Sequence, residues 1–150
     1  MADDRSYVEG NNRQRERLRA LVERLDDEAL STPVNEYWTV AAVLGHMAYW
    51  DLRFQTLAEK IDRGEPWVAG DQEPDGDWLN DSMRPLIHAL APWVAAELAL
   101  RTAEETDARA AELPLDRLWP GDPDSPISPA RGEHRGEHLD EIEAALGARG

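Results

Sequence analysis

The hydrophobic pattern of residues 11–26 is that of an amphipathic helix. Apolar side chains recur there at i, i+3, i+4 and i+7, and arginine and glutamate occupy the other face. The apolar positions are Leu18, Leu21, Val22 and Leu25. Asn11 or Asn12 is expected to cap the start of this helix. The stretch "STPVNEYW" that follows contains proline and no helical period, so it predicts a loop.

A second apolar stripe predicts a helix that follows Thr39 as its N-cap residue. Gly64 and Pro66 are expected to end it, because glycine favours a helix C-terminus and proline cannot continue the helix. The segment 65–77 is rich in glycine, proline and acidic residues and predicts a loop. The stripe itself consists of Val43, His46, Trp50, Phe54 and Leu57.

A third helical pattern runs from about Trp78 to Glu112. Pro85 and Pro92 lie inside it, and each removes a backbone donor and clashes with the preceding turn, so a kink or break is expected there. Residues 113–127 contain four prolines and predict a long crossing loop. The residues at helical spacing are Leu79, Met83, Leu86, Leu90, Trp93, Glu97 and Leu100.

The last helix is expected to begin with Ser128 as N-cap and Pro129 at its first position, and to run to Gly147. Its apolar stripe consists of Leu139, Ile142 and Leu146. The chain shows neither strand alternation nor an internal repeat. Four helical patterns separated by loops predict an all-α protein, a four-helix bundle formed by residues 1–150 as a single domain.

The composition of the chain excludes several kinds of site and partner. The chain has 150 residues and no cysteine, which excludes disulfides, thiolate zinc sites and cysteine nucleophiles. Its formal net charge of −15 disfavours nucleic acid as a partner, because a phosphate backbone would be repelled. No apolar run is long enough to span a membrane, and the N-terminus lacks the pattern of a secretory signal. A cytoplasmic protein without a membrane partner is expected.

Two histidines one helical turn apart are the first candidate for a metal site. His134 and His138 in "HRGEH" lie at i and i+4, on one face of the last predicted helix, a spacing that suits a shared metal ion. A solvated polar face is the alternative interpretation. His46 lies in an apolar context on the second helix, where a hydrogen-bonded core histidine is the alternative. If the bundle brings the three together, they leave positions open for water or substrate.

"HRGEH" also matches the inverted zinc-peptidase signature, in which Glu137 would be the general base. That class needs a further carboxylate ligand from a helix well downstream, and few residues follow His138. Glu137 is also expected to project away from His138, so an outward ion-pairing role is favoured over a catalytic one. The spacing links His88 to none of the other histidines, and a packing or surface role is expected for it.

The stretches "YWTVAAVLGHMAYWDLRF" (37–54) and "HRGEHLDEIEAAL" (134–146) together resemble the motifs of the DinB-like (YfiT-like) superfamily. The resemblance spans nearly the whole chain. It implies an up-down-down-up four-helix bundle and a histidine triad, His46, His134 and His138, that holds a divalent metal, zinc or nickel. Imidazole ligands discriminate poorly between these two ions.

The resemblance also implies a range of activities. Some members resemble thiol transferases that use mycothiol or bacillithiol, one branch isomerises maleylpyruvate, and another hydrolyses a reactive electrophile. The isomerases carry an additional C-terminal domain that this chain lacks. We therefore expect a metal-dependent thiol S-transferase or hydrolase that acts on a small electrophile, with mycothiol or another low-molecular-weight thiol as co-substrate. The alternative is a non-catalytic binding or self-protection protein that uses the same cavity. A homodimer is a further expectation.

Several other residues are candidates for the pocket. Trp50 is expected to be either an aromatic wall or a core residue, Asn80 a substrate contact or a helix cap, and Arg53 a substrate contact or an exposed ion-pair partner. Asp140 or Glu141 is a candidate acceptor that orients a ligand imidazole. Gly132 and Gly136 lie beside the histidines, where missing side chains either open space for a ligand or allow a close helix–helix contact.

Overall fold

The computed structural model describes residues 4–72 and 76–148, and this part of the chain is helical. It contains no named β-strand; Pro33 and Thr39 form one isolated bridge. Two short 3₁₀ turns cover Ala69–Asp71 and Leu115–Arg117. The α-helices are α1 (Tyr7–Glu23), α2 (Asp27–Ser31), α3 (Val40–Asp62), α4 (Gly76–His88), α5 (Pro92–Glu112) and α6 (Arg131–Ala148).

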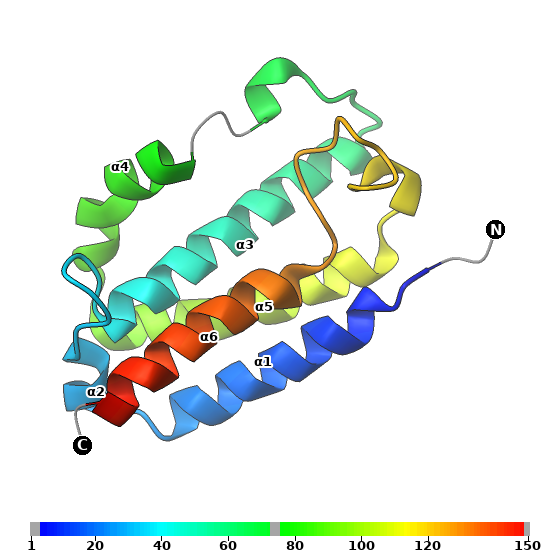
Figure 1. Ribbon diagram of the computed structural model, residues 1–150. Coiled ribbons are helices and arrows are strands. Elements are labelled where there is room, and N and C mark those ends of the chain that lie inside the picture. Colours follow the sequence, from blue (N-terminus) through cyan, green and yellow to red (C-terminus); the bar gives the residue numbers. More distant parts are fainter. Residues whose placement is uncertain (1–3, 73–75, 149–150) are drawn as a thin grey trace.

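Four of these helices are long and lie side by side. α1 packs on α6 and α5, and α3 packs on α5 and α6. α1 and α6 run in one direction and α3 and α5 run in the other, and α4 lies beside the N-terminal half of α3 (Figure 1). Within the described residues, none of the helices has the length and apolar character needed to cross a lipid bilayer.

The third predicted helix is in fact two helices. The helix is interrupted at residues 89–91, between α4 and α5. Pro92 takes the first position of α5, where its missing N–H removes no hydrogen bond. Pro85 stays inside α4 without ending it. The expected break therefore occurs at only one of the two prolines. The predicted loop 65–77 contains the turn Ala69–Asp71 and the start of α4, and its residues 73–75 lie outside the described part.

The helix ends confirm one predicted cap and correct two others. Thr39 accepts a hydrogen bond from the Ala42 backbone N–H and caps α3 as expected. α1 begins at Tyr7, so the prediction that Asn11 or Asn12 caps it was wrong. α6 begins at Arg131 rather than after Ser128, because residues 128–130 are not yet helical.

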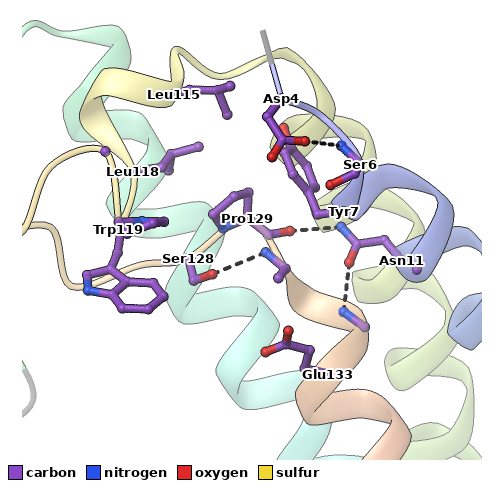
Figure 2. Close-up of a pocket in the computed structure, with 15 residues that line it drawn as sticks. Asp4, Ser6, Tyr7, Asn11, Leu115, Leu118, Trp119, Ser128, Pro129 and Glu133 are labelled. Atoms are coloured by element: carbon purple, nitrogen blue, oxygen red, sulfur yellow. Dashed lines mark hydrogen bonds between the residues drawn. The ribbon is translucent and has the colours of Figure 1, made fainter. Parts of the chain in front are cut away.

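Asn11 has a different task, which Figure 2 shows: it ties α1 to the start of α6. The side chain is only 2% exposed. Its amide nitrogen donates to the Pro129 carbonyl at 2.8 Å, and its oxygen accepts from the Gly132 N–H at 2.7 Å. A residue of one helix thus satisfies an otherwise unpaired N–H at the start of another, which fixes where α6 begins.

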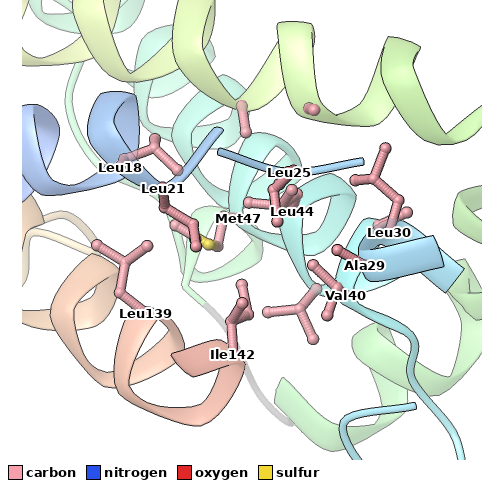
Figure 3. Close-up of a cluster of buried hydrophobic side chains, with 14 of the residues drawn as sticks. Leu18, Leu21, Leu25, Ala29, Leu30, Val40, Leu44, Met47, Leu139 and Ile142 are labelled. Carbon is pink, nitrogen blue, oxygen red and sulfur yellow. The ribbon is translucent and has the colours of Figure 1, made fainter. Parts of the chain in front are cut away.

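The core consists of two apolar clusters, with charged residues between them along α3 and α5. The larger cluster, shown in Figure 3, joins α1, α2, α3, α5 and α6. Its largest members are Leu18, Leu21, Leu30, Leu44, Leu139 and Ile142. The second cluster is built around Phe54, Leu57, Ile61, Leu118 and Ile127, so the predicted crossing loop supplies part of the core. The predicted stripes of α1, α3 and α6 all supply residues to these clusters.

Gly132 and Gly136 serve helix packing. A Cβ on Gly132 would lie 2.7 Å from the Gly10 carbonyl oxygen, so α1 and α6 approach here backbone to backbone. A Cβ on Gly136 would meet only the side-chain amide of Gln14, at 3.1 Å. The hypothesis that these glycines open space beside the histidines was therefore wrong: both face α1, where Gly132 allows the close backbone contact and Gly136 leaves room for the Gln14 side chain.

The two glycines predict opposite responses to alanine. Gly132→Ala forces the backbones apart, and overpacking of this kind costs about 1–3 kcal/mol in the free energy of unfolding. Gly136→Ala requires only that Gln14 move, and removing a helical glycine stabilises by up to about 1 kcal/mol. Urea denaturation of the two variants measures both changes. Equal destabilisation would contradict the assignment of the backbone contact to Gly132 alone.

Candidate metal centre

Three histidines meet between α3 and α6. His46 lies on the buried face of α3, and His134 and His138 lie one turn apart on α6. One ring nitrogen of each lies within 4.8 Å of the corresponding nitrogens of the other two. Trp38 and Trp50 pack against the His46 ring, with ring centroids 5.6 and 6.3 Å away. The fold thus brings together side chains that are separated by some ninety residues of sequence.

The environment keeps two of the rings neutral. Burial lowers the pKa of His46 to about 4, and the nearby His138 contributes to that shift. Burial likewise lowers the pKa of His134 to about 3, with smaller contributions from His138, Arg131, His46 and Arg135. At neutral pH both rings therefore keep a free nitrogen lone pair, which is the form that binds a metal ion.

The arrangement fits a divalent metal ion. The Nε2 atoms of His134 and His138 lie 3.0 Å apart. Two imidazole nitrogens on one tetrahedral zinc ion, each about 2.0–2.1 Å from it, would lie roughly 3.3 Å apart. Within the described residues, the buried Nδ1 atom of His46 has no hydrogen-bond partner, a costly state for a buried polar atom. A three-histidine set with nitrogen ligands suits zinc or nickel.

The low pKa values predict an acid-sensitive metal-free protein. The folded pKa values of His46 and His134 lie below the ordinary value of 6.5, so unfolding takes up protons at lower pH. The stability that the two neutral rings contribute is therefore fully present above pH 6.5, and it is lost as the pH falls from 6.5 toward their folded pKa values of about 4 and 3. We expect a loss of about 2 kcal/mol for each of the two histidines, about 4 kcal/mol in all, between pH 7 and pH 5, measured by thermal melts in chelator. Equal pH slopes in wild type and His134→Gln would contradict this cause.

A cavity of about 400 Å³ opens beside the histidines. Trp50 and Asn80, two of the candidates for the pocket, line it together with Arg131, which was not among those candidates. Arg53 is not among the lining residues: its guanidinium donates to the Asp71 carbonyl at 2.8 Å and lies over the Trp50 ring. Glu137 is exposed and lines no part of this cavity. The structure therefore brings two of the three predicted pocket residues to the histidines.

A second, smaller cavity adjoins the first. It has a volume of about 130 Å³ and shares His46, Asn80 and His138 with the larger one. Glu141 lines it and its Oε2 lies 3.4 Å from the Nδ1 atom of His138. Of the two predicted acceptors, Glu141 is thus the one beside an imidazole. Asp140 instead pairs with Arg17 at 2.6 Å.

His88 stays apart from the three histidines. Its Nε2 atom lies 2.8 Å from the Tyr37 carbonyl oxygen, and its ring stacks on Trp38 with centroids 5.8 Å apart. The predicted packing or surface role fits this position. Trp38 therefore lies between His88 and His46, and it joins α4 to the wall of the site.

Behind the histidines lies a buried network of charges. Asp51 of α3 accepts from Arg131 at 3.2 Å and Arg135 at 3.4 Å. Asp107 of α5 accepts from Arg135 at 3.0 and 3.1 Å, and from Arg15 of α1 at 2.8 Å. Arg135 is 2% exposed and lies next to His134 in the chain. The network therefore locks α6, and with it two of the histidines, against α1, α3 and α5.

A larger cavity, about 500 Å³, lies elsewhere. It lies between the start of α1, the crossing loop and the start of α6 (Figure 2). Leu115, Leu118 and Trp119 form its apolar side, and no histidine lines it. Size alone would favour this cavity, but the smaller one holds the metal-ligating groups and the shifted pKa values that mark a functional site.

Comparison with known proteins agrees with this geometry. The family model of the DinB superfamily matches residues 11–142, so the chain belongs to the DinB superfamily. All three histidines fall within the matched segment. Neither the search of curated proteins nor the search of solved structures gave a significant match.

Proposed function

We propose that this protein is a divalent-metal-dependent enzyme that activates a thiol or water for attack on a small electrophile, as a thiol S-transferase or a hydrolase. The observation that carries the proposal is the meeting of three histidine nitrogens within 4.8 Å at an open cavity. His46, His134 and His138 would hold zinc or nickel. A bound ion of this kind supplies Lewis acidity, which makes a thiol or water nucleophilic at neutral pH.

The chain's own residues would position the reactants. Trp50 forms an aromatic side of the cavity, and Asn80 and Arg131 supply the polar groups. The cavity of about 400 Å³ is of a size for a small molecule. The three-histidine set leaves coordination positions open, which distinguishes catalytic from closed structural sites. A thiol such as mycothiol is the co-substrate we propose for the transferase, and the up-down-down-up bundle implied by the resemblance is the arrangement we assign to α1, α3, α5 and α6.

One observation favours a second candidate, a binding or self-protection protein without turnover. Within residues 4–72 and 76–148, no carboxylate lines the cavity of about 400 Å³, so none of the described lining side chains is an obvious general base. Metal activation of a thiol does not require one, because coordination itself lowers the thiol pKa. We therefore retain the enzyme as the leading proposal.

The experiment separates the two functions. Protein loaded with zinc or nickel is mixed with a low-molecular-weight thiol and monochlorobimane, and in parallel with a p-nitrophenyl ester for hydrolysis. The enzyme proposal expects a rate that depends on the metal and disappears in chelator and in His46→Gln. Metal binding with no rate above background in either assay would overturn it in favour of the binding protein.

A further inference from the structure

The cavity beside the histidines is lined by donors and metal-ligating nitrogens. Six residues line it: His46, Trp50, Asn80, Arg131, His134 and His138. Of the residues that the structure describes, Arg131 is the lining residue that carries a permanent charge, and none of those that line the cavity is acidic. Glu133 and Glu137 are exposed residues of α6 that do not line it, and Glu141 lines the smaller neighbouring cavity. The polar character of the site therefore depends on Arg131 and Asn80.

The position of Arg131 is fixed from behind. Its Nε and Nη2 atoms both donate to one Asp51 oxygen, each at 3.2 Å, and the guanidinium lies over the Phe54 ring. The side chain is 15% exposed. Among the described residues, no partner is found for its remaining nitrogen, Nη1. A guanidinium held in this way is preorganised, so it loses little conformational freedom when it binds a further acceptor.

The buried network that holds Arg131 carries more positive than negative groups. Three guanidinium groups, from Arg15, Arg131 and Arg135, share two carboxylates, Asp51 and Asp107. This local excess lies in a chain with a net charge of −15. Arg131 lines the cavity itself, whereas Glu141, the acidic residue beside His138, lines the smaller neighbouring cavity, and physiological salt screens exposed charges beyond about 8 Å.

Asn80 adds a neutral donor. The indole N–H of Trp50 donates to the Asn80 side-chain oxygen at 3.0 Å. This bond uses the amide oxygen of Asn80 as an acceptor, so its NH₂ group is left to donate a hydrogen bond to a ligand. The indole N–H is used in the same bond. The cavity thus offers an amide donor and a guanidinium next to the metal ligands.

We propose that Arg131 and Asn80 bind a carboxylate, so that the substrate class of this site is a small molecule that carries a carboxylate close to its reacting group. The proposal rests on the proposed metal-dependent function and deepens it. The carboxylate belongs either to the thiol or to the electrophile. In both cases it would accept hydrogen bonds from Arg131 and Asn80. Arg131 acts as a specificity residue: it selects the anion and leaves metal binding to the histidines.

The test compares matched carboxylate and neutral probes on the metal-loaded protein. 3-Phenylpropionate is set against 3-phenylpropionamide, and 3-mercaptopropionate against 2-mercaptoethanol, with binding measured by NMR titration. We expect each carboxylate to bind about 10-fold more tightly than its neutral partner, the effect of one charge-assisted hydrogen bond. A preference confined to the thiol pair assigns the carboxylate to the thiol, and one that includes the non-thiol pair assigns it to the electrophile.

Variants show which group is responsible. Arg131→Lys keeps the charge opposite Asp51 but loses the planar fork, and Asn80→Leu removes the amide without touching the buried network. Both should reduce the carboxylate preference several-fold, whereas Arg84→Lys, which changes an arginine of α4 outside the cavity, should leave it unchanged. A preference that survives both cavity variants comes from direct coordination to the metal and overturns the proposal, as does the absence of any preference in wild type.

The failure of this inference can be told from failure of the proposed function. Metal content is measured on the same samples, so protein without metal contradicts the proposed function alone. The probe pairs are then repeated on that metal-free protein, where Arg131 and Asn80 should still favour the carboxylate. Bound metal without a carboxylate preference contradicts this inference and leaves the metal centre standing.

Discussion

Wild-type protein purified after growth with added zinc or nickel is expected to hold one equivalent of metal, and His46→Ala, His134→Ala and His138→Ala are each expected to lose it. The binding free energy of zinc at a four-ligand structural site is about 10–16 kcal/mol. Removing one ligand should therefore weaken metal binding by about 3 kcal/mol, which lowers the affinity about 100-fold or more. The loss follows from the geometry, because the three ring nitrogens lie within 4.8 Å of one another and no other residue in the described part of the chain belongs to the group. Metal content by mass spectrometry and affinity by calorimetry measure the effect.

His88→Ala is the matched control, because His88 contacts Tyr37 and Trp38 outside the cluster. It should keep full metal content. Metal should also raise the melting temperature of wild type and of His88→Ala, because binding to the folded state adds to the free energy of unfolding. It should leave the melting temperatures of the three ligand variants unchanged. Wild type that carries no metal, or a ligand variant that retains it at wild-type affinity, would refute the metal centre.

Large apolar side chains at helical spacing were sufficient to predict the buried faces of α1, α3 and α6. The same reasoning failed for α5, because its buried face consists mainly of small residues such as Ala96, Ala99 and Ala103. Leu86 of α4 and Trp93 of α5, which share the spacing of the third predicted helix, are 73% and 40% exposed. Alanines allow α3 and α5 to approach closely, but a hydrophobicity pattern gives them little weight. Packing between helices, rather than side-chain size, decides which face is buried.

The candidate site was predictable as far as it depends on local spacing and on the family motifs. His134 and His138 share a face of one helix, and the resemblance linked them to His46. Arg131 also shares that face, three residues before His134 and seven before His138, so the spacing contained a signal for it. Its partner Asp51 lies 80 positions away, and nothing local in the sequence indicates that such a contact forms. Buried ion pairs between helices depend on tertiary structure.

The second large effect is expected from Arg135, the residue between the histidines of "HRGEH" that faces the core. Arg135→Met should lower the free energy of unfolding by about 3 kcal/mol, because Asp107 loses a bidentate partner and Asp51 loses one of two arginines, which leaves each buried carboxylate with a single arginine. For a chain of this length each kcal/mol corresponds to about 2–4 °C, so the melting temperature should fall by roughly 10 °C. Thermal and urea denaturation of the metal-free protein measure the loss without a contribution from the ion.

Arg17→Met is the control, since Arg17 pairs with Asp140 and Glu143 at the same α1–α6 boundary but lies at the surface. Exposed pairs contribute about 1 kcal/mol or less, so this variant should remain close to wild type. Adding Asp107→Leu to Arg135→Met removes the carboxylate that lost both of its Arg135 hydrogen bonds and kept only Arg15, and should recover part of the stability. If Arg135→Met were no less stable than Arg17→Met, the buried network could not be what holds α6 in place, and the two α6 histidines would owe their positions to apolar packing alone.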